Sequence, residues 1–275
     1  MSTTTLNSDT IAYVCALVRQ RSAIELDAAK AYLIEARLSP LARRYGFSST
    51  TEMIRNLQAL PKPDVQRQLV EAMTTNETSF FRDAHPFDAL RTTIIPEMIR
   101  SRAGQRSLNV WSAACSTGQE AYSIAMLLRE HFPELVNWKV QILGTDLSDD
   151  VLEKARAARF SQIEINRGLP ATLLAKHFRR EGMQWELAPH IRSMASFCKL
   201  NLIERWPPMP LMDVVFLRNV LIYFSPETKK AILEKVRTVM APHAVLFLGA
   251  AETTMGLDAS FVRVQIDNSV FYRLK

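Results

Sequence analysis

The 275-residue sequence has few cysteines, scattered histidines and no long apolar run. Its three cysteines, Cys15, Cys115 and Cys198, are odd in number and far apart, which excludes a disulfide framework and a zinc pattern and predicts a reducing, cytoplasmic environment. The longest run of apolar or small residues, Ala244–Ala251, is far shorter than the roughly 20 residues that cross a bilayer, so we expect no membrane insertion. No pair among the five histidines has metal-ligand spacing, so we expect no metal site.

The sequence also lacks a strongly charged tail. Lys and Arg outnumber Asp and Glu by 34 to 28, a net charge of +6. Residues 1–106 hold 14 basic and 11 acidic side chains, and residues 107–275 hold 20 and 17, so both parts carry the same small excess. A basic protein can bind nucleic acid, but an even distribution supports this only weakly, and we expect no nucleic-acid partner. With 48% hydrophobic and 23% charged residues, the composition is that of a folded globular protein.

The pattern of apolar residues changes along the chain. Up to about residue 75 they recur at helical spacing, which predicts a small all-helical N-terminal domain over 1–75, followed by a linking segment over 76–106. Over 107–275 short apolar runs alternate with helical stretches, which predicts βαβ units and an α/β domain with a parallel sheet. The predicted strands are Leu108–Trp111, Val140–Leu143, Val214–Leu217 and Ala244–Leu248, and the predicted helices lie near Gln119–Arg129, Asp149–Ala158 and Pro226–Met240.

Two further parts of the second domain depart from simple alternation. The stretch over about 161–197 is longer than a crossover and has β-prone pieces at Met183–Leu187 and Ile191–Phe197, which predicts an inserted β-subdomain. The segments Phe261–Gln265 and Ser269–Leu274 flank a turn at Asp267 and predict a hairpin at the end of the chain.

The junction between the first predicted strand and helix, residues 112–120, consists of small side chains around one glycine and ends at Glu120. It contains neither the G-x-G-x-x-G pattern of dinucleotide sites nor a Gly-Lys-Ser/Thr phosphate loop, which disfavours NAD and ATP. Asp146 follows the second strand, where an acid can accept hydrogen bonds from ribose hydroxyls. Small residues, acids and no phosphate clamp suit S-adenosylmethionine. An equally good interpretation is a tight turn, with Glu120 favouring a helix start and Asp146 capping a helix.

The segment over residues 73–83 is a second candidate. Thr78 and Arg82 lie four residues apart, so on a helix their side chains share a face and can reach one ligand. Thr74 and Glu77 also form a capping-box pattern, which explains the threonines without a ligand and which the segment alone favours.

A third candidate lies where the strand Val214–Leu217 ends. Arg218 and Asn219 follow it directly, at the strand end where ligands collect in such folds, and Tyr223 comes a few residues later. The pair Asn201–Leu202 is predicted to lie at the same edge of the sheet. The alternative is an arginine that emerges to solvent and a tyrosine that packs in the core.

In these segments the sequence resembles the CheR-type chemotaxis receptor glutamate O-methyltransferases, over nearly the whole chain. The similar stretches are Met73–Arg82, Val110–Ser123, Gly144–Ala155 and Phe216–Phe224, in this order. The resemblance implies a Rossmann-like class I methyltransferase sheet, the cofactor S-adenosyl-L-methionine with product S-adenosyl-L-homocysteine, and a cofactor-contacting helix within 76–106. It also implies cytoplasmic receptor domains as partners, with a receptor C-terminal pentapeptide docked on the β-subdomain in some members. We expect a monomer.

Carried over residue by residue, the resemblance implies nine cofactor-binding positions and two positions beside the reacting groups. Arg82 and Tyr223 are the two catalytic candidates. The cofactor-binding candidates are Asn76, Thr78, Arg82, Glu120, Asp146, Asn201, Leu202, Arg218 and Asn219.

The sequence departs from the family at two places. In the turn that commonly reads S-T-G-E-E-P-Y-S, Gln119 and Ala121 replace a Glu and the Pro, while Glu120 is kept. The basic second helix lacks one expected arginine. Its remaining basic residues, either a receptor contact or a solvated helix face, are Lys30, Arg37, Arg43 and Arg44.

The chemistry implied by the resemblance needs no general base. A glutamate with a pKa of about 4.3 is already ionised at pH 7, so the absence of a His/Asp pair is expected. One alternative is a nucleic-acid methyltransferase, which Asn219-Val220-Leu221 disfavours because an N/D-P-P-Y/F segment is expected at that place. Another is a non-catalytic receptor-binding scaffold, which the retained Glu120, Asp146 and Asn219 disfavour.

Overall fold

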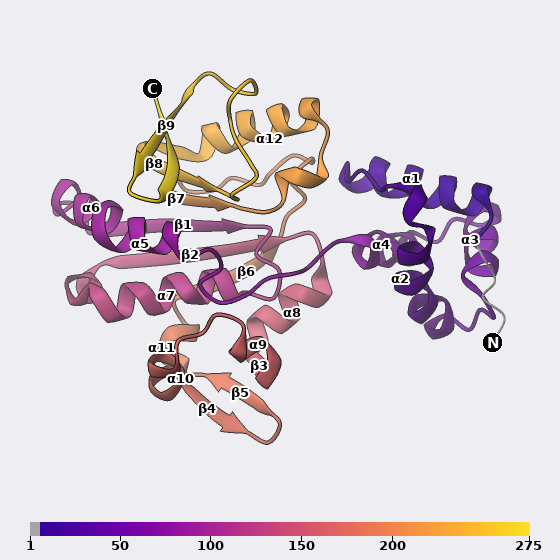
Figure 1. Ribbon diagram of the computed structural model, residues 1–275, viewed down its shortest axis with the longest axis horizontal. Coiled ribbons are helices and arrows are strands. Elements are labelled where there is room, and N and C mark those ends of the chain that lie inside the picture. Colours follow the sequence, from indigo (N-terminus) through magenta and orange to yellow (C-terminus); the bar gives the residue numbers. More distant parts are fainter. Residues whose placement is uncertain (1–5) are drawn as a thin grey trace. The chain divides into compact units, whose positions relative to one another are not determined.

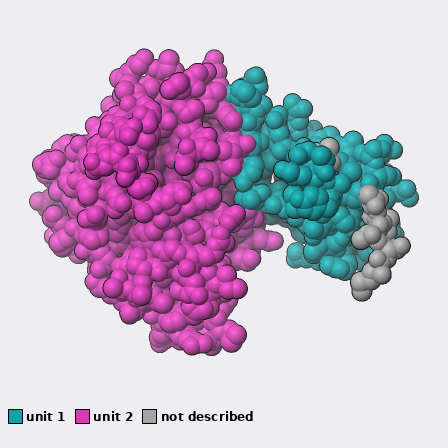
Figure 2. Space-filling model, viewed as in Figure 1, with its two compact units in different colours: residues 1–75, 223–228 teal, residues 76–222, 229–275 magenta. Residues whose placement is uncertain are grey.

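The computed structural model describes residues 6–275. The chain divides into two compact units, coloured separately in Figure 2. Unit 1 comprises the described residues 6–75 and Tyr223–Thr228, and unit 2 comprises Asn76–Ile222 and Lys229–Lys275. Among the described residues, no helix combines the length and apolar character needed to cross a membrane.

Unit 1 is helical, as the spacing of its apolar residues predicts. The Asn7 side chain caps the first helix and the Ser49 side chain caps the third, while Pro63 occupies the first turn of the fourth. The helices bury one apolar face each, which forms the core of the unit. They are α1 (Ser8–Ser22), α2 (Ala31–Arg44), α3 (Thr50–Ala59) and α4 (Pro63–Met73), with a short 3-10 turn, η1 (Ala28–Lys30), before α2.

Unit 2 is built on a seven-stranded sheet of order β6-β2-β1-β7-β8-β10-β9 (Figure 1). The five strands from β6 to β8 are parallel to their neighbours, and β10 runs antiparallel to both β8 and β9. The predicted α/β fold and the terminal hairpin are therefore confirmed. The strands are β1 (Ser107–Ala113), β2 (Lys139–Asp146), β6 (Ala195–Lys199), β7 (Met212–Leu217), β8 (Met240–Leu248), β9 (Phe261–Ile266) and β10 (Ser269–Leu274).

Helices connect these strands. Figure 1 shows them arranged around the sheet, and α7 contacts both β1 and β2. The three predicted helices are present as α7 (Gln119–His131), α8 (Asp149–Ala157) and α12 (Pro226–Val239). The short turn η3 (Pro133–Asn137) lies between α7 and β2, and η4 (Leu221–Tyr223) lies between β7 and α12. A further run before β1 consists of α5 (His85–Ala89), the π-helical turn η2 (Leu90–Ile94) and α6 (Ile95–Ser101).

The insertion between α8 and β6 contains a second, three-stranded antiparallel sheet of order β3-β5-β4. Its elements are β3 (Arg159–Ser161), α9 (Gln162–Asn166), α10 (Ala171–His177), β4 (Phe178–Glu181), β5 (Gln184–Leu187) and α11 (Pro189–Arg192). The β-prone stretch expected over Ile191–Phe197 is therefore split. Pro189 begins a helix, and residues from Ala195 onward form β6, which pairs with β2 in the main sheet instead of extending the insertion.

The expectation of a helix that brings Thr78 and Arg82 to one face is wrong, because residues 75–84 contain no helix. Thr74 ends α4 and its hydroxyl donates to Glu71 O, so the capping-box interpretation is also wrong. Phe81 and Asp83 have positive φ angles of 47° and 54°, which a helix does not allow.

Candidate functional site

Three of the predicted site residues of unit 2 end or follow parallel strands. Asp146 is the last residue of β2, Asn201 follows β6, and Arg218 follows β7. Because the carboxyl ends of parallel strands lie at one edge of a sheet, these residues share the edge at which ligands bind in this class of fold.

The turn between β1 and α7 is tight and depends on small side chains. Ala114, Ser116 and Gly118 have φ angles of 55°, 50° and 92°. A Cβ on Gly118 would lie 3.0 Å from the Cβ of Ala155, so a larger residue there would crowd α8 as well as strain the backbone. The small residues singled out from the sequence therefore allow a backbone path that larger side chains would obstruct.

Asp146 holds this turn in place. Its Oδ2 accepts a hydrogen bond from Ser116 N at 2.9 Å and its Oδ1 accepts one from Ser148 N at 3.1 Å, while the side chain is buried. The capping interpretation is not borne out, since Ser148 is the N-cap residue of α8 and Asp146 accepts from the N–H of that residue. A carboxylate oxygen can accept more than one hydrogen bond, so the anchoring role leaves Asp146 suited to ribose hydroxyls.

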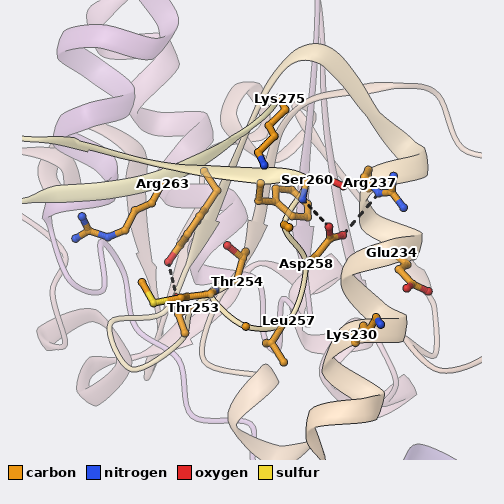
Figure 3. A pocket seen from close by; sticks show the side chains of 15 residues that line it. Lys230, Glu234, Arg237, Thr253, Thr254, Leu257, Asp258, Ser260, Arg263 and Lys275 are labelled. Carbon is orange, nitrogen blue, oxygen red and sulfur yellow. Dashed lines mark hydrogen bonds and ion pairs between the residues drawn. The ribbon is translucent and has the colours of Figure 1, made fainter.

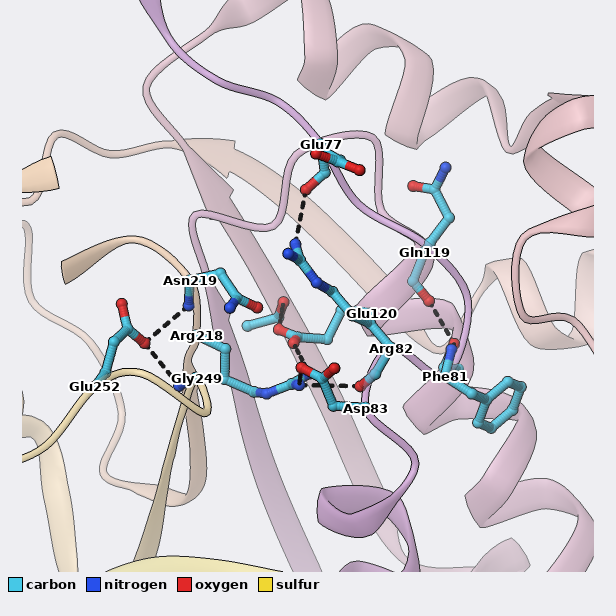
Figure 4. A network of polar contacts seen from close by, with 12 residues as sticks. Glu77, Phe81, Arg82, Asp83, Gln119, Glu120, Arg218, Asn219, Gly249 and Glu252 are labelled. Carbon is cyan, nitrogen blue, oxygen red and sulfur yellow. Dashed lines mark hydrogen bonds and ion pairs between the residues drawn. The ribbon is translucent and has the colours of Figure 1, made fainter. Parts of the chain in front are cut away.

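Arg218 is the centre of a buried polar network (Figure 4). Its Nη1 donates to Glu120 Oε2 at 3.0 Å, and its Nη2 donates to Asp83 Oδ2 at 2.8 Å and to Arg82 O at 2.9 Å. The other Glu120 oxygen accepts from Ser112 Oγ at 2.7 Å. Arg218 thus joins the end of β7 to the first turn of α7 and to the chain at Arg82, and its terminal nitrogens bind protein atoms.

Residues 76–83, hereafter the 76–83 segment, run along this edge and are fixed from two sides. Ser116 Oγ donates to Asn76 O at 2.8 Å, on the side of the main sheet. On the side of the insertion, Arg167 forms an ion pair with Glu77 at 2.5 Å, and Phe80 is fully buried among aromatic rings of the insertion. Thr78 is half-buried in this segment.

The Arg82 side chain is half-buried, and its Nη1 donates to Glu77 O at 3.0 Å within the 76–83 segment. A guanidinium carries five N–H donors in a planar fork, so it can bind a carboxylate in addition to this one carbonyl. This geometry suits the role predicted for Arg82.

Asn201 and Leu202 lie in the loop after β6. The Asn201 amide donates to Glu204 Oε1 at 3.0 Å and accepts from Ile203 N at 3.3 Å, which forms a compact turn. Lys235 Nζ donates to the carbonyls of Leu202 and Glu204, and burial lowers the Lys235 pKa. Leu202 itself is buried. This loop is therefore clamped to α12.

Tyr223 belongs to unit 1, where Glu25 N donates to Tyr223 O at 3.0 Å. Its predicted place beside the reacting groups stays a prediction.

In the same unit, Arg37 donates to Met73 O at 2.7 Å and to Thr74 O at 3.1 Å. Arg37 therefore satisfies carbonyls at the end of α4, which separates it from the other members of the basic set.

Cys115 lies beside the site and is buried, in surroundings that keep its thiol protonated. Burial raises the pKa of its thiol well above the usual range, and the charges of Asp146 and Glu120 raise it further. Because the thiolate is the reactive form of cysteine, this environment disfavours Cys115 as a nucleophile.

The sequence patterns did not single out Glu252, which lies beside the Arg218 network. Glu252, in the loop after β8, accepts hydrogen bonds from the backbone N–H groups of Asn219 and Gly249 (Figure 4). The rule that selected Asp146, an acid just past a buried parallel strand, applies equally to Glu252 and would have identified it.

A cavity of about 710 Å³ lies in another part of unit 2, along the loop between β8 and β9 (Figure 3). Its walls include the ion pair of Arg237 with Asp258 at 3.6 Å and the hydrogen bond from Tyr272 Oη to Thr253 Oγ1 at 3.4 Å. None of the predicted site residues lines it. Within residues 6–275, no three His, Cys, Asp or Glu side chains are grouped as metal ligands would be.

Comparison with known proteins identifies the family. The model described as "CheR methyltransferase, SAM binding domain" matches residues 76–270, and the model described as "CheR methyltransferase, all-alpha domain" matches residues 9–74. The chain belongs to the CheR methyltransferase family. S-adenosylmethionine is therefore its cofactor, and the resemblance seen in the sequence is confirmed.

Relatives of the CheR family match this chain over nearly its full length. The chemotaxis protein methyltransferase Cher2 of Pseudomonas putida is 40% identical over 90% of each chain. Chemotaxis protein methyltransferase 1 of Pseudomonas aeruginosa is 40% identical over 92% of this chain and 93% of that protein. Among solved structures, the DhpI–SAH complex aligns with a TM-score of 0.33 and 18% identity over 68% of this chain and 73% of that chain.

Proposed function

We propose that this CheR protein transfers a methyl group from S-adenosylmethionine to glutamate side-chain carboxylates of chemoreceptors and forms glutamyl methyl esters. The observation that carries the proposal is the match of both CheR domain models, together with relatives named chemotaxis protein methyltransferases that align over 90% or more of the chain. This assigns the protein the activity of a protein-glutamate O-methyltransferase that acts on cytoplasmic receptor domains.

The residues at the edge of the sheet fit the proposed cofactor. S-adenosylmethionine supplies an electrophilic methyl group on a sulfonium and carries no phosphate. The acids Glu120 and Asp146 suit a cationic, hydroxyl-bearing ligand, and the tight β1–α7 turn suits close approach of the backbone. We assign cofactor binding to Asn76, Thr78, Arg82, Glu120, Asp146, Asn201, Leu202, Arg218 and Asn219.

Within this set, the proposed role of Arg218 is to hold other cofactor-binding residues in place. Its ion pairs with Glu120 and Asp83 fix the first turn of α7 against the 76–83 segment, so two groups of proposed cofactor ligands keep one geometry. Fixing reacting groups in line can contribute on the order of 7–11 kcal/mol to a transfer reaction.

Arg82 and Tyr223 are the proposed catalytic residues. The Arg82 guanidinium would orient a carboxylate, and the Tyr223 hydroxyl would position the glutamate. An arginine 4 Å from a carboxylate contributes about 4 kcal/mol of attraction at an effective dielectric of 20, so it holds the substrate but also reduces its nucleophilicity. Arg82→Ala and Tyr223→Phe should each reduce turnover, and near-normal turnover in both variants would refute the assignment.

The insertion is the proposed docking site for a receptor C-terminal pentapeptide. Its strand β4 lies at the end of the order β3-β5-β4, and Arg179, Arg180 and Glu181 on it are exposed. An edge strand of this kind can pair with an extended peptide. The proposed assembly is a monomer that meets the receptor through this edge and through basic residues of α2.

The test is transfer of labelled methyl from S-adenosylmethionine to membranes that carry candidate receptors, followed by mild alkali. Glutamyl methyl esters release labelled methanol, whereas N-methyl groups survive. Label that resists alkali would indicate another substrate class, including nucleic acid. No affinity for S-adenosylmethionine or S-adenosylhomocysteine in calorimetry would favour a non-catalytic scaffold.

A further inference from the structure

The Glu252 carboxylate receives hydrogen bonds from four backbone N–H groups. Its Oε2 accepts from Gly249 N at 2.6 Å and from Asn219 N at 2.8 Å. Its Oε1 accepts from Val220 N at 2.9 Å and from Ile222 N at 3.2 Å. One side chain from the loop after β8 therefore binds most of the loop that follows β7.

The loop held in this way has an unusual backbone. Asn219 adopts a left-handed conformation with φ of 57°, which asparagine tolerates better than most residues but which still needs support from its surroundings. The hydrogen bond from Asn219 N to Glu252 provides that support directly.

Gly249 has no side chain, which leaves space for Asn219 and Glu252. A Cβ at Gly249 would lie 2.7 Å from Asn219 Nδ2, 2.7 Å from Glu252 Oε2 and 2.8 Å from Asn219 N. A Cβ contact under 3.0 Å forces the neighbouring atoms to shift, so an added methyl group would displace the Asn219 side chain, the Glu252 carboxylate and the backbone at Asn219 (Figure 4). Asn219, Gly249 and Glu252 therefore pack as one cluster.

A carboxylate suits this place because it accepts hydrogen bonds and donates none. Glutamine has the same shape, but one of its two terminal atoms is an NH₂ group. Whichever way the amide is turned, its NH₂ group faces two of the four N–H donors and leaves them without an acceptor. The position therefore discriminates between Glu and Gln more strongly than a surface site would.

We propose that Glu252 is a positioning residue, which acts through Asn219 to set the geometry of the cofactor site. The inference rests on the proposed function, in which Asn219 binds S-adenosylmethionine. Asn219 directly follows Arg218, whose guanidinium binds Glu120 and Arg82 O, so displacement of this loop reaches the other proposed ligands as well.

The test measures the affinity for S-adenosylhomocysteine by calorimetry in the full chain, with a double-mutant cycle. Glu252→Gln and Asn219→Ala should each weaken binding by about 10-fold to 100-fold, because each leaves hydrogen-bonding groups of the site without a partner. If Glu252 acts through Asn219, the double variant should bind within about twofold of Asn219→Ala. The matched control is Glu234→Gln, which makes the same change at an exposed position of α12 and should bind as the wild type does.

Two further measurements separate positioning from loss of folding. Gly249→Ala keeps the carboxylate but crowds Asn219, and it should weaken binding comparably. In Glu252→Ala, added formate should occupy the N–H groups and restore part of the affinity, which a general folding defect would not allow.

Glu252→Gln affinity within twofold of wild type, or effects of Glu252→Gln and Asn219→Ala that multiply in the double variant, would overturn the inference. If Glu252→Gln does not fold, wild-type affinity in Gly249→Ala would overturn it instead. A wild type that binds S-adenosylhomocysteine but methylates no receptor would contradict the proposed substrate alone. A wild type that does not bind it would overturn both.

Discussion

Replacing Gly168 with alanine tests whether the insertion holds the 76–83 segment in place. Gly168 has a φ of 90°, and a Cβ there would lie 2.1 Å from the carbonyl oxygen of Phe80, a backbone atom. Gly182, in the turn between β4 and β5, provides a matched control because its φ is 60° and a Cβ would meet nothing within 4 Å. Both substitutions force alanine into a left-handed conformation, but only the first displaces the chain.

The two costs can be separated by magnitude. A left-handed alanine costs about 1–2 kcal/mol, and the stiffer unfolded chain returns about 0.4–1 kcal/mol, so Gly182→Ala should lower the free energy of unfolding by about 1.6 kcal/mol at most. Gly168→Ala adds the displacement of well-packed backbone, about 1–3 kcal/mol more. Phe80 is fully buried against Phe160, at a ring distance of 5.0 Å, so it cannot retreat freely.

The assay is urea denaturation combined with calorimetry of S-adenosylhomocysteine binding. We expect Gly168→Ala to lose more stability than Gly182→Ala and to bind the ligand at least about tenfold more weakly, because the displaced carbonyl belongs to the 76–83 segment. Equal stability and equal affinity in the two variants would refute the idea that the insertion supports this segment.

Two further predictions concern charges away from the cofactor edge. Asp213 is fully buried and accepts from Arg102 and from Asn109 N, so Asp213→Asn should lower the free energy of unfolding by about 3–5 kcal/mol in urea titrations, with methyl transfer unchanged in the folded protein. The hydrogen bond from Lys176 lowers the Glu130 pKa from 4.5, so Glu130 stabilises the fold above pH 4.5 and this contribution is lost as the pH falls through the lowered value. The stability advantage of wild type over Glu130→Gln should therefore be present at pH 7 and decrease as the pH falls below 4.5, and an advantage independent of pH would contradict it.

The alternation of apolar runs was enough to predict β1, β2, β7 and β8 of the central sheet, whereas the stretch that forms β6 was expected to belong to the insertion. Runs such as Val214–Leu217 are apolar at every position, as expected for strands covered on both faces, and β7 is buried along its whole length. The 76–83 segment could not be predicted in the same way. The four-residue spacing of Thr78 and Arg82 is compatible with a helix, but the burial of Phe80 among rings from residues 160 and 178 determines the conformation, and that contact is distant in sequence.

The candidate site was likewise predictable from the sequence only in part. The edge on which the residues lie follows from strand direction, so Asp146, Asn201 and Arg218 could be placed from the sequence. The direction of each side chain could not. The Arg218 guanidinium turns toward Glu120 and the carbonyl of Arg82. These acceptors lie 98 and 136 residues away in the sequence, so no local pattern predicts the contacts.

The contacts of the 76–83 segment bear on how receptor docking and methyl transfer relate. The segment is tied to the main sheet through Asn76 and through the Arg82 carbonyl, and to the insertion through the Glu77–Arg167 ion pair and Phe80. The exposed ion pair contributes little, about 0–1 kcal/mol, whereas burial of the phenylalanine contributes about 1.5–3 kcal/mol. Apolar packing is therefore the stronger link between the insertion and the cofactor edge. Under the proposed docking of a peptide on β4, a movement of this strand would reach the 76–83 segment through Phe178 and Phe80, whose rings lie 5.8 Å apart.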